Sequence, residues 1–173
     1  MKFRMTPIIP HPLNVSGIQQ ALINGMRDVG QRIREDFEDT TKTWNHQPKF
    51  EPSFPIPVVS TEKITVTTET SDKIYNWVNE GTNVGKPRYP IRPHNPPSAL
   101  AFPSQFIPKT FPGIIGSGAG FSGGETRYAK EVLHPGVEPR DFVGHIGDKN
   151  LGGFKLELER AMKLAAKASG HGL

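Results

Sequence analysis

The sequence has 173 residues, a formal net charge of +4 and no cysteine. This length suits one domain with a single core, and the lack of cysteine excludes a disulfide framework, a thiolate zinc site and a thiol nucleophile. Glycine and proline contribute 18 and 17 residues, so much of the chain is expected to be loop, turn or extended arm. No apolar run reaches 18 residues, so the sequence predicts no membrane span.

A proline-rich start precedes the strongest helical pattern in the chain. We expect residues 1–15 to be an N-terminal arm and residues 16–173 to form one domain. Ser16, with Gln19 three residues later, has the pattern of a capping box. Apolar residues then recur every three or four positions, which predicts an amphipathic helix over about 17–40. Four of its apolar residues are expected to be buried: Leu22, Met26, Val29 and Ile33.

Three later segments have the composition of strands. Four prolines within 48–57 exclude a helix and predict an extended or edge segment that carries Phe50 and Phe54. Over 62–70, β-branched residues alternate with polar ones, as on a half-buried strand. The apolar run 100–102 predicts a short buried strand that ends at the next proline.

A short helix is predicted between the second and third of these segments. Asp72, or the serine before it, can cap a helix over 73–80. Gly81 ends this helix because glycine readily takes a left-handed conformation. Tyr75 is expected to point into the core.

The C-terminal part is divided by further glycines and prolines. A strand over 126–134 is expected to lead into a tight turn at residues 135–136. Pro139 suits the first position of a short helix that Gly147 closes. A separate amphipathic helix is expected over about 154–169.

Together these elements predict an α+β fold. A small antiparallel sheet would pack against the long N-terminal helix and the C-terminal helix. The proline-rich arm 83–98 and the glycine-rich loop 113–124 would lie outside regular structure. We expect the N-terminal arm and the glycine-rich loop to gain order by contacting neighbouring subunits.

No segment has the pattern of a catalytic, cofactor or metal site. The glycine run 116–120 lacks both the preceding strand and the following helix of a nucleotide site. The histidines include no metal-binding spacing, and His134, Asp141 and Ser122 lack the rigid frame that a catalytic triad needs. The acidic residues within 35–39 fit a solvated helix face. We therefore expect a protein that is not an enzyme and holds no cofactor.

Basic residues interleave with aromatic ones between residues 86 and 109. Such a segment could track a nucleic-acid backbone, or it could be an arm that lies on a partner protein. The modest net charge favours the partner protein, and a nucleic-acid-binding module remains the alternative. The residues expected to contact DNA or a partner are Lys86, Arg88, Arg92 and Lys109.

Two segments together resemble signatures of the neck and tail-completion proteins of tailed bacteriophages. The first is the stretch 75–82, which reads Tyr-Asn-Trp-Val-Asn-Glu-Gly-Thr. The second is 128–136, which ends in His-Pro-Gly and is followed by Pro-Arg-Asp-Phe at 139–142. The residues that carry the resemblance are Tyr75, Trp77, Gly81, Thr82, His134, Pro135, Gly136 and Phe142.

This resemblance implies a structural role. It implies a homo-oligomeric ring of six or twelve copies that joins head and tail, located in the neck or head-proximal tail of the virion. The implied neighbours are head-closure, portal, tail-terminator or tail-tube proteins, and the positive charge would suit contact with packaged DNA. Synthesis would take place in the cytoplasm of the host bacterium.

Overall fold

The computed structural model describes residues 14–53, 67–95 and 98–171. These residues form a mixed α+β structure, as predicted from the sequence. The helices within them are α1 (Val15–Thr41), α2 (Lys73–Glu80) and α3 (Phe142–Ala168). The strands are β1 (Glu51–Ser53), β2 (Thr67–Glu69), β3 (Tyr89–Ile91), β4 (Leu100–Ile107), β5 (Phe121–Ala129) and β6 (Val132–His134).

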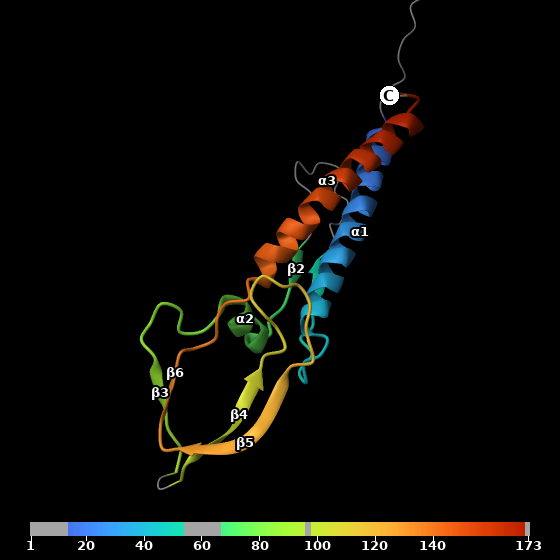
Figure 1. Cartoon of the computed structure of the whole chain (residues 1–173). Helices are drawn as coiled ribbons and strands as arrows, with labels where there is room; N and C mark the ends of the chain where they lie inside the picture. The colour runs from blue at the N-terminus through green and yellow to red at the C-terminus, as the bar shows by residue number, and fades with distance from the viewer. Residues whose placement is uncertain (1–13, 54–66, 96–97, 172–173) are drawn as a thin grey trace, which may run out of the picture.

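Helices α1 and α3 lie side by side and antiparallel, and they project from the rest of the molecule as an elongated pair (Figure 1). At the tip of the pair, the Asn14 N–H donates to Ser169 Oγ at 3.0 Å. The backbones approach closely at Gly25, where an added Cβ would lie 3.7 Å from the Glu157 carbonyl oxygen. This is an ordinary van der Waals distance, so an alanine would fit at this position. No helix of the described residues is long and apolar enough to cross a membrane.

The start of α1 lies slightly earlier than predicted. Asn14, and not Ser16, is the N-cap, because its side chain accepts a hydrogen bond from the Gly17 N–H at 3.0 Å. The Ser16 hydroxyl instead donates to the Asn14 side chain at 2.8 Å. Asparagine and serine cap helices about equally well, so the pattern alone did not distinguish them.

The predicted apolar face of α1 is only partly enclosed. Met26 and Val29 are buried, as expected. Leu22 and Ile33 are half-buried, which corrects the expectation that all four would be buried. Both share the buried face of α1 with Met26 and Val29, so their partial exposure does not follow from the helical period.

Helix α3 is continuous, and this corrects the prediction of two helices over 139–147 and 154–169. It runs through Gly147, Gly152 and Gly153 without interruption. Each glycine costs up to about 1 kcal/mol relative to alanine in a helix. Packing along α1 outweighs this cost, because most helical stability in proteins comes from tertiary contacts.

An aromatic cluster forms the core where the base of the helix pair meets α2. Its buried members are Phe37, Phe50, Tyr75, Phe142 and Ile146. Tyr75 lies at the centre, with ring centroids 4.9 Å from Phe50 and 5.6 Å from Phe142. Such aromatic pairs contribute about 0.5–1.5 kcal/mol each beyond the burial of their area.

The described strands pair in three separate two-stranded antiparallel sheets. Strand β1 pairs with β2 beside α1, β3 pairs with β6, and β4 pairs with β5. The predicted segments 48–57 and 62–70 thus contain short paired strands, at 51–53 and 67–69. Phe54, residues 62–66 and the N-terminal arm up to residue 13 lie outside the described residues.

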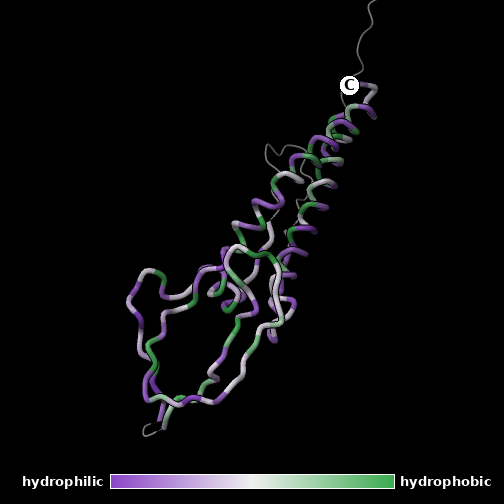
Figure 2. Tube along the Cα trace, viewed as in Figure 1, coloured by the Kyte–Doolittle hydropathy of each residue, from purple (hydrophilic) through white to green (hydrophobic). Residues whose placement is uncertain are grey.

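The β4–β5 ribbon is longer and more exposed than predicted. The expected short buried strand 100–102 is the start of an eight-residue strand, β4, whose side chains are mostly exposed. The expected strand 126–134 is two strands with different partners, and β5 begins inside the predicted glycine loop. Proline at 103 does not end β4, because it lies beside a register shift where no ladder donor is needed. Figure 2 shows hydrophobic stretches along β4, away from the helix pair.

The two predicted arms also contain ordered structure. The proline-rich stretch 83–98 includes β3. The first part of the glycine-rich loop packs on the end of α1, where Ser117 Oγ donates to the Asp39 carbonyl at 3.2 Å and accepts from the Thr43 N–H at 3.2 Å. The loop is therefore held by its own chain at this point.

Candidate functional site

The segments that carry the phage resemblance meet at one junction between α2 and the turn after β6. The Thr82 N–H donates to the Val137 carbonyl at 2.9 Å, and the Val137 N–H donates to Thr82 Oγ1 at 2.9 Å. Thr82 and Val137 therefore form a reciprocal bridge across 55 positions of the sequence. Both segments are needed to build it.

Two glycines are required at this junction. Gly81 has φ +76°, and an added Cβ would lie 2.7 Å from the Val137 carbonyl oxygen. Gly136 has φ +94°, and its Cβ would lie only 2.0 Å from the Thr82 carbonyl oxygen. L-residues rarely take such φ values, and neither position has room for a side chain. The predicted turn at residues 135–136 is thus a point of close contact between backbones.

Asn79 links the end of α2 to the start of α3. Its carbonyl oxygen accepts from the N–H groups of Arg140 and Asp141, at 3.1 and 3.0 Å. Its side-chain oxygen accepts from the Val143 N–H at 3.2 Å. Asp141, with φ +50°, is the N-cap of α3 and accepts from the Gly144 N–H at 3.3 Å. The sequence analysis did not single out Asn79.

The aromatic members of the two segments have different surroundings. Tyr75 and Phe142 are buried against each other in the core. Burial raises the pKa of the Tyr75 hydroxyl well above its ordinary value, while the nearby Thr40 opposes this shift. Trp77, on the same helix, has 58% of its surface exposed. Tyr75 and Phe142 therefore support the fold, and Trp77 lies on the surface.

His134 has a structural contact in this arrangement. Its Nδ1 accepts a hydrogen bond from the Gly136 N–H at 2.9 Å, which holds the turn. Its ring also packs on Tyr89, with centroids 5.5 Å apart. Among the described residues, no group of three or more histidines or carboxylates is placed to hold a metal ion.

The four predicted basic contact residues do not share one surface role. Lys86 and Arg88 are exposed before β3. Arg92 pairs with Glu131 across the β3–β6 ribbon. Lys109 is half-buried, and its Nζ donates to the carbonyl of Thr43 and to the Asn45 side chain. Two of the four charges are thus engaged within the chain, and contact with DNA or a partner stays a prediction for the other two.

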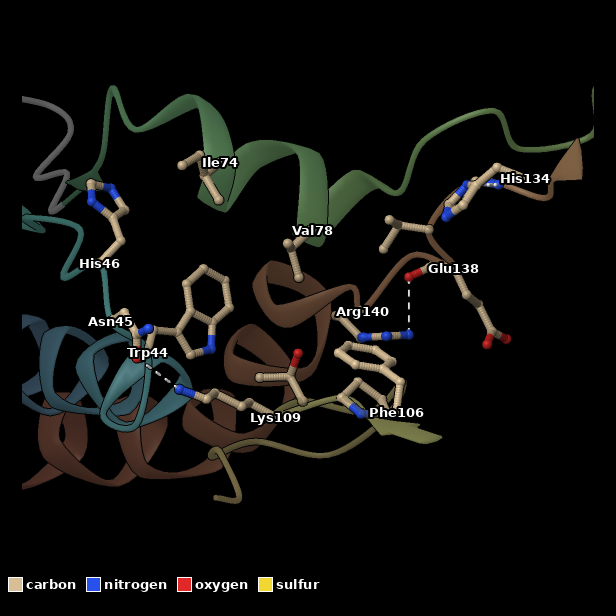
Figure 3. A pocket seen from close by; sticks show the side chains of 14 residues that line it. Trp44, Asn45, His46, Ile74, Val78, Phe106, Lys109, His134, Glu138 and Arg140 are labelled. Atoms are coloured by element: carbon tan, nitrogen blue, oxygen red, sulfur yellow. Dashed lines mark hydrogen bonds between the residues drawn. The ribbon is translucent and has the colours of Figure 1, made fainter. Parts of the chain in front are cut away.

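A groove of about 700 Å³ opens beside the junction, between α2 and the base of the β4–β5 ribbon (Figure 3). We call it the Arg140 groove. Ile74 and Val78 line it from α2, Trp44 from the loop after α1, and Phe106 from β4. Arg140 lies among these apolar side chains. Sequence analysis missed this groove because its walls come from four separated segments.

One rim of the groove contains a hydrogen-bonded histidine and aspartate. His46 contacts the Asp72 carboxylate, which also caps α2 by accepting from the Tyr75 N–H at 2.8 Å. The hydrogen bond from His46, followed by that from the Tyr75 N–H, lowers the pKa of Asp72 below its ordinary 3.8. The carboxylate therefore stays charged at neutral pH and holds the start of α2.

The β4–β5 ribbon exposes large apolar side chains on both of its faces. Phe106 and Tyr128 are each 71% exposed, and Ile107 and Phe121 are about half exposed. A hollow of about 460 Å³ lies beside the ribbon, lined by residues of β3, β4, β5 and β6. Large apolar side chains seldom gather on the surface of a monomer without a partner.

Comparison of the chain with family models, curated proteins and solved structures gives no match.

Proposed function

We propose that this chain is a structural subunit of a tailed-bacteriophage virion that forms a ring in the neck or at the head-proximal end of the tail. One observation carries the proposal. The two segments that resemble the neck and tail-completion signatures fold into a single hydrogen-bonded junction. Gly81 and Gly136 take conformations there that other residues rarely adopt. The motif residues therefore define a shared fold element, as a structural signature should.

The exposed ribbon supports assembly. An isolated two-stranded ribbon is marginally stable in water, and β4 presents eight residues without a charged side chain. Edge strands of this kind are usually protected by charges or by pairing with another chain. A neighbouring subunit would cover the apolar side chains and supply the missing strand contacts.

A ring requires that each subunit present two different surfaces to its neighbours. Such heterologous contacts close when the rotation between subunits divides a full turn. We expect six or twelve copies, with head-closure, portal, tail-terminator or tail-tube proteins above and below. Lys86 and Arg88 are the charges best placed to meet packaged DNA, because both are exposed.

The alternative, a nucleic-acid-binding module, has less support. Its basic segment would need a continuous row of free charges. Arg92 and Lys109 are instead engaged with Glu131 and with the loop after α1. Salt-dependent DNA binding by the dispersed chain, with loss of about one unit of salt slope for each of Lys86→Gln and Arg88→Gln, would favour this alternative.

Electron microscopy tests the ring proposal. Native mass spectrometry and negative-stain images of the purified full chain should show closed rings. A gold label on the C-terminus should appear between head and tail in particles of the phage that encodes the chain. A chain that remains a monomer and is absent from purified particles would contradict the proposal.

A further inference from the structure

The Arg140 groove contains a charge that the described part of the chain does not balance. Arg140 is only 9% exposed. Its Nη1 donates to the Glu138 carbonyl at 3.0 Å, and its Nε is buried without a hydrogen-bond partner among the described residues. Within the same residues, no carboxylate lies at ion-pair distance from this guanidinium. A cation with five donors thus makes one hydrogen bond to a neutral carbonyl.

The two nearest acidic residues in the sequence do not serve as its counter-ion. Asp141 caps α3 through the Gly144 N–H. Glu138 contributes its backbone oxygen, and in Figure 3 its carboxylate points away from the Arg140 guanidinium. Buried charges are normally paired, because an unpaired one has lost its hydration without compensation. Among the described residues, the Arg140 guanidinium therefore has no counter-ion.

The lining of the groove defines what would complete it. Trp44, Ile74, Val78 and Phe106 offer apolar contact beside the guanidinium. A carboxylate carried next to a large apolar group matches both properties, since arginine binds carboxylates through paired, charge-assisted hydrogen bonds. A hydrated phosphate backbone would leave the apolar walls uncovered.

The chain itself exposes such a pair of side chains. Trp77 and Glu80 lie three positions apart on α2, so they share one face of the helix. Trp77 is the exposed one of the two tryptophans, and Glu80 is exposed and forms no ion pair among the described residues. Tryptophan is enriched among the residues that dominate the energy of protein interfaces. Ile74, which lines the groove, lies three positions before Trp77, so Trp77 borders the groove on the same helix.

We propose that the Arg140 groove of one subunit receives Trp77 and Glu80 from a second copy of the chain, with the Glu80 carboxylate on the Arg140 guanidinium. This inference rests on the proposed ring, and it names the contact between neighbours. The contact joins Trp77 and Glu80 of one copy to Arg140 of another, so different residues meet on its two sides, as a heterologous ring contact requires.

Cysteine cross-linking tests the contact directly, because the natural chain has no cysteine. Chains with Glu80→Cys are mixed with chains that carry Glu138→Cys, which places a thiol at the groove. Any mixed disulfide must then join two copies. We expect a cross-linked pair under mild oxidation, and none when Glu159→Cys, exposed on α3, replaces Glu138→Cys.

Substitution provides a second readout that leaves the groove intact. Glu80→Gln should weaken association at least about tenfold, because a charge-assisted hydrogen bond is lost. Trp77→Ala should weaken it further, while Glu159→Gln, exposed on α3, should have no effect. Neither Trp77 nor Glu80 is buried, so the circular dichroism of these variants should match that of the natural chain.

The outcomes separate this inference from the proposed function. Rings that form without a disulfide between the thiols introduced at positions 80 and 138, and that tolerate Glu80→Gln, would overturn the contact and leave the ring. Cross-linked copies that never close into a ring would keep the contact and contradict the ring. A chain that forms neither the disulfide nor a ring would overturn both the contact and the ring.

Discussion

Apolar side chains are buried at the base of the helix pair and exposed along the β4–β5 ribbon. At the base, Tyr75 and Phe142 are enclosed by other aromatic rings. Along the ribbon, Phe106 and Tyr128 are largely exposed. The difference indicates that stability of the fold depends on the first region, whereas the second is available for contacts with other subunits. Substitutions in the two regions should therefore be separable by experiment.

The largest effect is expected inside the helix pair. Val29→Asp would bury an unpaired carboxylate at a position that is 5% exposed, and this should cost more than about 4 kcal/mol. Since small domains are stable by about 5–15 kcal/mol, this cost is a large fraction of the total, and a domain at the lower end would come close to unfolding. Urea denaturation measures the change. The control Gln31→Asp, exposed on the same helix, should change the free energy of unfolding by less than about 1 kcal/mol. An equally harmful control would refute the assignment of the buried face.

The junction should respond next most strongly. Gly136→Ala should reduce the free energy of unfolding by about 3 kcal/mol, because it combines an unfavourable φ with a Cβ overlapping the Thr82 carbonyl. Gly147→Ala, in helix α3 with open space around it, should instead stabilise the chain by about 0.5–1 kcal/mol. Changes of opposite sign in the free energy of unfolding, measured by thermal and urea unfolding, would support the distinction between a constrained and an unconstrained glycine. Equal signs would contradict it.

A smaller effect is expected at the cap of α2. The folded-state pKa of Asp72 is lowered, so its charge stabilises the fold above the ordinary pKa of 3.8, and this stabilisation is lost as pH falls through the folded value. Asp72→Asn keeps a good cap but removes the charge, and it should cost up to about 1 kcal/mol at pH 7. The difference from the natural chain should shrink towards pH 2. A cost that is independent of pH would show that the charge has no role.

The smallest effect on stability is expected on the ribbon. Tyr128→Ser removes a side chain that is 71% exposed, so the free energy of unfolding of the dispersed chain should change by less than about 0.5 kcal/mol. Association, followed by light scattering, should nevertheless weaken. Val84→Ser, exposed on a different loop, should alter neither quantity. Unchanged association of the Tyr128 variant would show that this part of the ribbon does not contact another subunit.

Helices whose apolar residues are regularly spaced were predictable from the sequence. The pairing of segments that are distant in the sequence was not. The period of the apolar residues located α1 within two residues at its start, and Asp72 and Gly81 correctly bounded α2. Helix α3 was divided wrongly because Gly147 has a low local propensity, whereas its packing partner lies over a hundred positions earlier in the sequence. A local pattern of residues gives no information about such a distant contact.

The pairing of the strands and the geometry of the candidate site also depend on contacts between distant segments, which local patterns do not predict. The alternation of side chains around residue 128 identified extended structure, but it could not show that β5 and β6 have different partners. The motif glycines were recognised, while their close contact across the Thr82–Val137 bridge became evident only in the structure. Arg140 was noted only as part of a motif, since its burial depends on side chains brought from three other segments.

Helix α3 carries three glycines near its base, in a stretch where Lys149 and Asn150 both donate to Asp36 of α1 at 2.7 Å. Phe142 is held in the aromatic cluster, and Ser169 is bound to Asn14 at the tip. Between them, Gly147, Gly152 and Gly153 together lower the helical preference by up to about 3 kcal/mol. Amide hydrogens in this stretch should therefore exchange with solvent through local openings while both ends remain closed. Such an opening would break the hydrogen bonds of Lys149 and Asn150 to Asp36 and leave the aromatic cluster closed.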